Sequence, residues 1–326
     1  MGVFRVALHS ASLACAARRV PVVPEGRPVK HDHVPVRAVV LICAATLCFA
    51  TLDVVLKALS ARYPVPMLVW ARWTVQALAI LAWLVPRRGV ADLRTRFAGR
   101  HLGRGVVLIA SSVTFVYALH ALPLAIVTAI NYTTPMIVVL LAVLLLDERL
   151  TPPRAAFVIA GAIGMLLIVR PGSDVFRGAS LLALASATLY ALFQISTRRM
   201  AAEHPIALLF YPALAGSVLL AIPTAFSPDA FTAMTGRDAA LLVAGGVVGA
   251  LGHLMFILAF RRAPASALTP FTYVHLVWAM VFGWLVFGTF PDALALAGMA
   301  IIAGSGLLIT VHERRRAAGP PPAGAD

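Results

Sequence analysis

The sequence repeats itself at a spacing of about 141 residues, and each repeat contains five apolar runs of membrane-spanning length. Between the 28-residue segments that begin at Gly105 and Gly246, eight positions carry the same residue, among them Tyr132 and Tyr273. Composition alone would produce roughly three such matches. Five is an odd number, so two consecutive halves of this kind must enter a membrane in opposite orientations. Inverted halves recur in secondary transporters.

Composition supports a membrane protein. Hydrophobic residues make up 61% of the chain and charged residues 12%, about half the usual charged share. A helix needs about 20 apolar residues to cross a bilayer, and the chain has ten such runs. We therefore predict an all-α integral membrane protein with spans at 37–60, 66–86, 103–121, 124–146, 152–170, 178–198, 206–226, 239–261, 266–288 and 292–311.

The net charge of +14 does not indicate nucleic-acid binding, because the arginines cluster between the apolar runs. If the N-terminus is cytoplasmic, 21 Lys and Arg residues fall inside and four fall outside. The positive-inside rule then predicts that both termini are cytoplasmic. The connection at 87–104 carries six arginines, whereas its repeat equivalent at 227–238 carries one arginine and two aspartates. Opposite charge in equivalent connections is what inverted halves require.

The predicted organisation has four parts. Two helical repeats, at 37–170 and 178–312, lie between polar tails at 1–36 and 313–326 that we expect to be disordered and cytoplasmic. Tandem glycines such as Gly245, Gly249 and Gly252 predict close helix packing.

Motifs of soluble enzymes are missing from the sequence. It contains no HExxH, GxSxG, paired-cysteine or P-loop motif. The missing P-loop argues against ATP hydrolysis on this chain, and Cys15, Cys43 and Cys48 have no metal-ligand spacing. We expect neither a cofactor nor a metal, and no enzymatic activity.

Charged residues within a membrane span are costly and therefore informative. Asp53 and Lys57 share one face of the first span, and Arg72 and Gln76 share one face of the second. One interpretation is an Asp53–Arg72 salt bridge that ties the two spans, with Lys57 reaching outward. The other is that the excess positive charge attracts a carboxylate or phosphate of a solute. Asp53 is also the candidate for proton coupling.

A second group of polar residues lies at equivalent places in the two repeats. Each repeat has a Thr–Tyr pair one helical turn apart and a proline, which frees a backbone carbonyl. These residues either line a central solute cavity or join helices by hydrogen bonds, and an aromatic side chain one turn further on could stack on a planar solute. The candidates are Thr128, Asn131, Tyr132, Thr269, Thr272, Tyr273, His275 and Trp278. His253 is interpreted as a packed polar residue or a proton relay.

The strings "ALPLAIVTAINYTTPMIVVLLAVLLLDERLTPPRAAFVIAGAIGMLLIVRPG" and "RRAPASALTPFTYVHLVWAMVFGWLVFGTFPDALALAGMAIIAGSGLLI", together with the two five-span repeats, resemble EamA-type permeases of the drug/metabolite transporter superfamily. The resemblance covers roughly 37–312. It implies ten helices, a bacterial inner-membrane location, and a central cavity lined by the third, fourth, eighth and ninth spans. Glu148 and Arg149 match the acidic–basic pair after the fourth span, but the second repeat has Gly288 and Thr289 there.

The favoured function is a secondary transporter that moves an unidentified small polar metabolite across the bacterial inner membrane by alternating access. Its partners would be that solute and the lipid bilayer, with protons as a candidate coupling ion. The alternative is a membrane-embedded enzyme or lipid-handling protein without transport activity.

Overall fold

A computed structural model describes residues 35–89, 93–146, 150–170, 178–200, 203–263 and 265–317. Within these ranges the regular structure is helical and contains no strand. The first half has the helices α2 (Val36–Ser60), α3 (Val65–Arg88), α4 (Ala98–Ala121), α5 (Leu124–Asn131), α6 (Thr134–Leu146) and α7 (Pro152–Val169). The second half has α8 (Gly178–Arg198), α9 (Pro205–Leu219), α10 (Ala221–Ala225), α11 (Pro228–Thr232), α12 (Gly236–Phe260), α13 (Ala265–Thr272), α14 (Val274–Phe287) and α15 (Ala293–Ala317).

Within the described residues, ten segments are long and apolar enough to cross a membrane, which confirms the predicted number. They are 36–60, 65–86, 98–121, 124–145, 152–169, 178–197, 205–225, 236–260, 267–287 and 293–312. The largest difference is at α4, which begins five residues earlier than predicted. Its first turns carry His101 and Arg104, and protein partners bury both side chains. A hydropathy pattern does not anticipate polar residues that are buried by protein.

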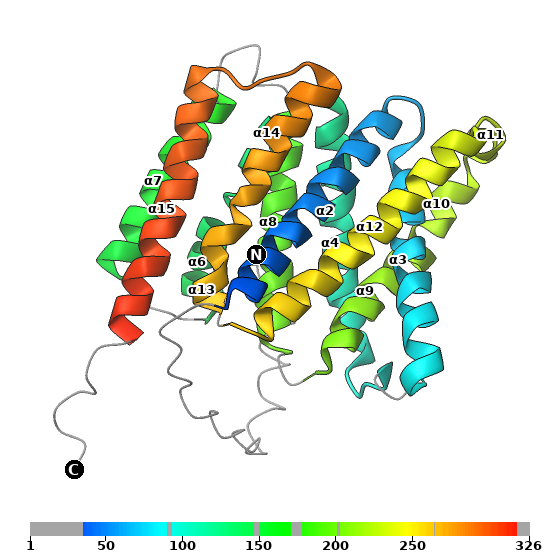
Figure 1. Cartoon of the computed structure of the whole chain (residues 1–326), viewed down its shortest axis with the longest axis horizontal. Helices are drawn as coiled ribbons and strands as arrows, with labels where there is room; N and C mark the ends of the chain where they lie inside the picture. The colour runs from blue at the N-terminus through cyan, green and yellow to red at the C-terminus, as the bar shows by residue number, and fades with distance from the viewer. Residues whose placement is uncertain are drawn as a thin grey trace, which may run out of the picture. The chain divides into compact units, whose positions relative to one another are not determined.

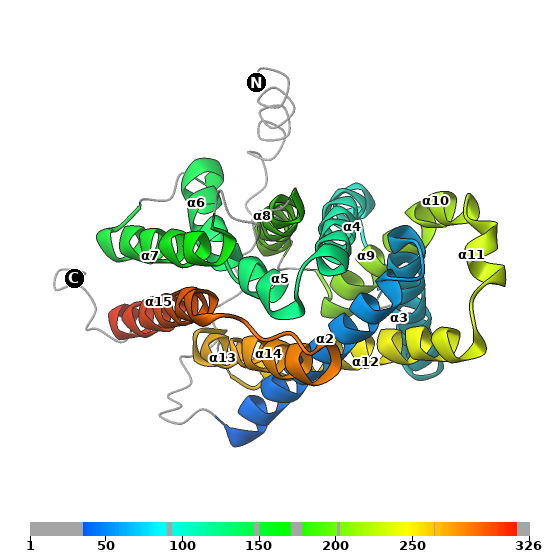
Figure 2. The ribbon, with the colours of Figure 1, turned by 90° about the horizontal axis from the view of Figure 1, so that it is seen from above.

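The helices form two layers, seen best in Figure 2. One layer contains α15, α13 with α14, α2 and α12, and the other contains α7, α5 with α6, α8, α4 and α9 (Figures 1 and 2). At one end the layers are joined by packing of α7 on α15, and at the other by α3, which packs on both α9 and α12. Each layer therefore mixes helices from both halves of the sequence.

Glycines allow the closest helix pair in the first layer to approach. A Cβ at Gly249 of α12 would lie 2.8 Å from Leu52 of α2, and one at Gly252 would lie 2.9 Å from Phe49. Gly245 faces Val55 in the same way. The predicted role of these three glycines in close packing is therefore confirmed, and small residues at such contacts are how membrane helices pack without a hydrophobic driving force.

Three of the described membrane spans are interrupted: one at Leu220, between α9 and α10, and two others whose interruptions lie 141 residues apart. The earlier of those two lies between α5 and α6 at Tyr132–Thr133, and the later lies between α13 and α14 at Tyr273. Pro135 cannot donate to the carbonyl of Asn131, one turn before it. The Thr134 hydroxyl donates to that carbonyl instead, over 2.6 Å. The sequence predicts that proline frees a backbone carbonyl, and the structure shows that the Thr134 hydroxyl replaces the missing amide donor.

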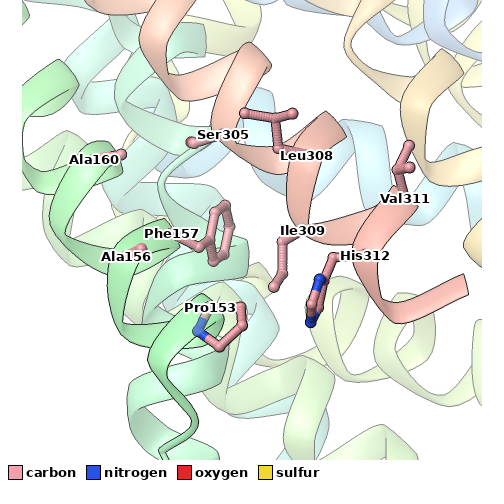
Figure 3. Close-up of a pocket in the computed structure, with 9 residues that line it drawn as sticks. All are labelled: Pro153, Ala156, Phe157, Ala160, Ser305, Leu308, Ile309, Val311 and His312. Carbon is pink, nitrogen blue, oxygen red and sulfur yellow. The ribbon is translucent and has the colours of Figure 1, made fainter. Parts of the chain in front are cut away.

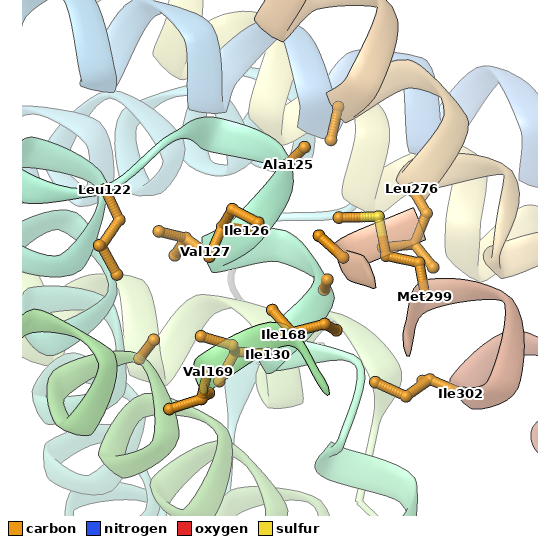
Figure 4. Close-up of a cluster of buried hydrophobic side chains, with 14 of the residues drawn as sticks. Leu122, Ala125, Ile126, Val127, Ile130, Ile168, Val169, Leu276, Met299 and Ile302 are labelled. Atoms are coloured by element: carbon orange, nitrogen blue, oxygen red, sulfur yellow. The ribbon is translucent and has the colours of Figure 1, made fainter. Parts of the chain in front are cut away.

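The two layers meet through an apolar cluster on one side of the interruptions. Most of its residues come from α5, α7, α14 and α15, and others come from α4, α6 and α8. Figure 4 labels Leu122, Ala125, Ile126, Val127, Ile130, Ile168, Val169, Leu276, Met299 and Ile302. On this side α5 packs on α14 across the layers. Beyond the interruptions, α6 packs on α7 and α8, whereas α13 packs on α15, α2 and α12.

The two predicted tails fall largely outside the described residues. Residues 1–34 and 318–326 are not described, and neither are Glu148 and Arg149. The last helix continues to Ala317, five residues beyond the predicted end of the second repeat.

Candidate functional site

The two helix interruptions are joined by one hydrogen bond. The Tyr132 hydroxyl donates to the carbonyl oxygen of Thr272 over 2.5 Å. In a continuous helix that carbonyl would accept from Leu276, but the Leu276 amide bonds Tyr273 instead. Breaking the helix at Tyr273 therefore releases an acceptor, and a phenol from the other repeat takes it.

The two Thr–Tyr pairs are equivalent in sequence but have different surroundings. The rings of Tyr132 and Tyr273 lie 5.2 Å apart. Tyr132 is partly exposed, whereas Tyr273 is 7% exposed and packs where Gly306 of α15 leaves room for its hydroxyl. Thr128 is buried and donates to Leu124 of its own helix. Tyr132 is thus the phenol that joins the layers, and Thr128 packs in the core.

Asn131 connects this centre to two more helices. Its amide donates to the Ser186 hydroxyl of α8 over 3.1 Å. Ser186 in turn donates to the carbonyl of Ser111 on α4, and the Ser111 hydroxyl donates to the carbonyl of Ser186. In the second repeat, the Thr272 hydroxyl donates to the carbonyl of Thr269. In the structure, Asn131 thus joins helices by hydrogen bonds, and Thr272 bonds within its own helix.

The salt bridge between Asp53 and Arg72, one of the two interpretations of these charges, is not formed. Asp53 Oδ2 instead lies 3.4 Å from His275 Nε2 on α14. Their geometry is not that of an aligned hydrogen bond, so the contact is an ion pair only when the imidazole is protonated. Arg72 lies over the ring of Trp73, 4.6 Å from its centre, and its Nε has no hydrogen-bond partner. The helices cross so that α14, rather than α3, faces the carboxylate.

In the structure the Lys57 side chain extends to the end of α4. Its ammonium donates to the carbonyls of Leu119 and Leu122 over 2.7 and 2.6 Å. These carbonyls end α4, where a cation is favoured by the helix dipole. The ammonium also lies 5.4 Å from the ring centre of Phe287 on α14. Lys57 therefore links α2 to α14 in its own layer and to α4 in the other layer. Its ammonium bonds these helices rather than Asp53.

Three other polar residues singled out from the sequence are buried or packed against aromatic rings. Gln76 is buried on α3, one turn from Arg72. Trp278 stacks on Phe282 with ring centres 6.4 Å apart, and its Nε1 has no hydrogen-bond partner. His253 packs edge-on against Phe49 at 4.8 Å, and its Nε2 also has no hydrogen-bond partner.

Sequence reasoning missed Tyr190 on α8. Tyr190 lies in the neighbourhood of Arg72 and Tyr132, and 36% of its surface is exposed. Phe193 stacks beside it at 5.8 Å. The residue 141 positions before Tyr190 is Phe49, which is not polar, so the repeat gave no signal for Tyr190.

Ionic contacts outside this centre join the ends of the helices. The Arg170 guanidinium binds Asp292 and holds the pKa of that carboxyl below its usual value. Asp238 of α12 accepts from Tyr63 over 2.8 Å and lies 3.3 Å from Arg62. The described residues contain no group of three or more metal-ligating side chains.

A more deeply buried network joins the start of α4 to the start of α9 and the end of α8. His101 Nε2 lies 3.0 Å from Glu203 Oε2, and the imidazole packs against Tyr211 with ring centres 4.5 Å apart. The fully buried His101 imidazole is the main group that lowers the pKa of Glu203, and a hydrogen bond with Thr95 adds to the effect. Arg104 donates to the Thr197 hydroxyl and to the carbonyl of Leu208. The network explains why α4 starts earlier than its hydropathy predicts.

A family model for EamA-like transporters matches the chain twice, at residues 36–170 and 177–311. The chain belongs to the EamA-like transporter family. It is 31% identical over 271 residues to a riboflavin transporter of Brucella anthropi, covering 82% of this chain and 95% of that protein. It is 30% identical to the pseudopaline exporter CntI of Pseudomonas aeruginosa, covering 81% and 92%.

Other matches are more distant. A S-adenosylmethionine uptake transporter of Rickettsia conorii is 26% identical and covers 81% of this chain and 88% of its own length. A solved crystal structure at 22% identity superposes with a TM-score of 0.61 and covers 85% of this chain and 98% of its own, which shows a shared fold. This EamA-like protein is a multi-pass protein of the bacterial inner membrane.

Proposed function

We propose that the protein is a secondary transporter that moves a small polar metabolite by alternating access. The observation that carries the proposal is the hydrogen bond from Tyr132 to the Thr272 carbonyl. It joins the broken helices of the two repeats between the layers. Broken helices at matching places in two repeats are where such transporters hold their solutes. Family membership supports the same function.

The solute site comprises the side chains around that bond. Tyr132, Asn131, His275 and Asp53 supply hydrogen-bonding groups, and Tyr190 with Trp278 supplies ring faces. Arg72 adds a cation whose Nε is unpartnered. A metabolite with a ring and a carboxylate or phosphate suits this set, because rings stack on aromatic side chains and guanidinium binds such anions. Riboflavin, S-adenosylmethionine and pseudopaline, named for the relatives, are the first solutes to test.

The proposed topology is two five-span halves in opposite orientations, with both termini cytoplasmic. The arginine bias supports it. Because α5 packs on α14 while α6 and α13 pack within their own layers, the layers are held together more firmly on the side of the apolar cluster. Under the proposed topology that side is periplasmic, and solute reaches the site from the cytoplasmic side in this state.

A cysteine-accessibility experiment tests the topology. Thr95→Cys lies between α3 and α4, and Ser227→Cys lies between α10 and α11. An impermeant maleimide applied to intact cells should label Ser227→Cys and not Thr95→Cys, with Cys15, Cys43 and Cys48 replaced by serine in both. Labelling of Thr95→Cys from outside would refute the orientation.

Flux measurements test the function itself. The purified protein in liposomes should move at least one of the three solutes down an imposed gradient, and protein-free liposomes should not. The protein should leave both solute and lipid chemically unchanged, since we propose no enzymatic activity. A modified lipid or solute without flux would replace the transporter proposal by the enzyme alternative.

Proton coupling is proposed at Asp53 and His275. The two groups lie 3.4 Å apart on different spans, so adding or removing one proton switches their attraction on or off. An imposed pH gradient should drive accumulation in the wild type. Asp53→Asn should retain equilibrating flux but lose the accumulation, and unchanged accumulation would remove Asp53 from the coupling mechanism.

A further inference from the structure

A groove lies between α7 and α15, at one end of the two layers and away from the proposed solute site. Its volume is about 520 Å³, within the range of small-molecule sites. Figure 3 shows Phe157 and Ile309 facing each other across it, with Pro153 and His312 at one end. The nine lining residues are Pro153, Ala156, Phe157, Ala160, Ser305, Leu308, Ile309, Val311 and His312.

The groove exists because the two helices touch elsewhere. At Gly164 and Gly298 their backbones are in contact, since a Cβ on Gly164 would lie 2.8 Å from the Gly298 carbonyl oxygen. Pro153 lies roughly three helical turns from that contact. There the lining residues do not fill the space between the helices, so a groove is left.

The wall of the groove is apolar and open. Leu308 is 73% exposed and Val311 is 43% exposed, and seven of the nine lining residues carry no polar side-chain atom. In a chain whose spans cross a bilayer, an exposed apolar surface at span depth faces lipid tails. An acyl chain is the apolar ligand present there at high concentration.

One end of the groove has a different chemistry. His312 contributes an imidazole whose Nε2 has no hydrogen-bond partner. Arg154 follows Pro153 in the first turn of α7, and helix α15 continues past His312 with Arg314, Arg315 and Arg316 in sequence. The first turn of α7 also bears the positive end of its helix dipole. Basic groups of this kind at the end of a membrane span favour anionic headgroups.

We propose that this groove binds one anionic phospholipid. The phosphate lies at the end formed by Pro153 and His312, where the imidazole donates to it. One acyl chain lies along Phe157, Ala160 and Ile309. A second copy of the protein is less suited, because a stable interface needs about 1,200 Å² or more of buried surface and the groove is a narrow channel between two helices.

Native mass spectrometry of the purified protein tests the proposal, with phosphatidylglycerol and phosphatidylcholine of the same chains as probes. The wild type should retain one phosphatidylglycerol in preference to phosphatidylcholine. Ala160→Trp fills the groove and should reduce that retention by about fivefold or more. Ile159→Trp is the matched control, because Ile159 is 60% exposed on the same helix but does not line the groove.

His312→Leu tests the headgroup end separately. It keeps an apolar side chain of similar bulk and should lower phosphatidylglycerol retention about threefold by removing a charge-assisted donor, while leaving phosphatidylcholine unchanged. Melting temperatures near that of the wild type would show that both variants fold. Three results would each overturn the proposal. The wild type could retain the two lipids equally, Ala160→Trp could retain as much phosphatidylglycerol as the wild type, or the protein could form a dimer that Ala160→Trp dissociates.

Discussion

Tyr132 donates its hydroxyl proton to the backbone carbonyl of Thr272, over 2.5 Å, and thereby bridges the interruptions of two spans that are 141 residues apart in sequence. The acceptor is free because the helix breaks one residue later. A side chain from one repeat thus completes the backbone of the other. The bond can hold the layers together and can be exchanged for a bond to a solute.

Tyr132→Phe should therefore lower the solute flux. The variant keeps the ring contact with Tyr273 but leaves the Thr272 carbonyl without its donor, which costs about 1–3 kcal/mol when the group is buried. Because about 1.4 kcal/mol corresponds to a factor of ten, initial flux in liposomes should fall about tenfold. Tyr117→Phe, on a 42% exposed residue of α4, is the control and should leave flux unchanged. An unaltered flux in Tyr132→Phe would contradict the role of this bond.

Asp53→Asn and His275→Gln should show strong coupling in a double-mutant cycle. Each single change removes the ion pair, so the double variant should lose little more pH-driven accumulation than either single variant. The measurement is accumulation at several imposed pH differences. Independent, additive losses would mean that the two groups act separately despite their 3.4 Å separation.

Lys57→Met should destabilise the protein, because it leaves two carbonyls at the end of α4 without their charged donor. Hydrogen bonds from charged groups contribute about 1.5–3 kcal/mol, so the melting temperature in detergent should fall. Lys57→Arg retains a cation and should lose less. Arg37→Met, at the exposed start of the same helix, provides the comparison. Equal melting of the Lys57→Met and wild-type proteins would show that water replaces the ammonium.

Gly249→Val should separate α2 from α12. A Cβ at Gly249 lies within 2.8 Å of Leu52, and overpacking of this kind costs about 1–3 kcal/mol. Gly304→Ala has open space around its Cβ and should be neutral or stabilising by up to about 1 kcal/mol. Thermal unfolding of both variants decides the matter, and a Gly249→Val protein as stable as Gly304→Ala would contradict the packing argument.

Glu203 should make stability depend on pH. His101, then Thr95, holds the pKa of Glu203 below its ordinary value of 4.5. A depressed pKa means that this contribution is complete above about pH 4.5 and is lost as the pH falls through the folded-state pKa. Glu203→Gln should thus melt below the wild type near neutral pH and approach it in acid. Asp229→Asn, on exposed α11, should show no such convergence.

Most of the helical architecture could be predicted because it depends on local properties. Span number and approximate bounds follow from the length of each apolar run, and the breaks near Tyr132 and Tyr273 follow from prolines within one helix. The polar start of α4 was not predictable in this way. Its His101 and Arg104 are buried by Glu203 and Thr197, about a hundred residues away.

The candidate site was only partly predictable for the same reason. The sequence placed Asp53 and Arg72 on the first two spans and allowed a salt bridge between them, but it does not specify which face of a helix meets which neighbour. The fold rotates Asp53 toward His275 and directs Lys57 to the end of α4. Tyr190 enters the site because α8 packs between α5 and α4, a relationship with no counterpart in the repeat.

By itself, the sequence determined ten apolar spans, a 141-residue repeat and the polar residues that the repeats share, because hydropathy, spacing and proline act within a single helix. Only the tertiary structure decided that Tyr132 reaches Thr272, that Asp53 pairs with His275, and that α7 and α15 leave a groove between them. Those relationships depend on how helices rotate and cross when two layers pack, and that is settled by contacts between residues far apart in the chain.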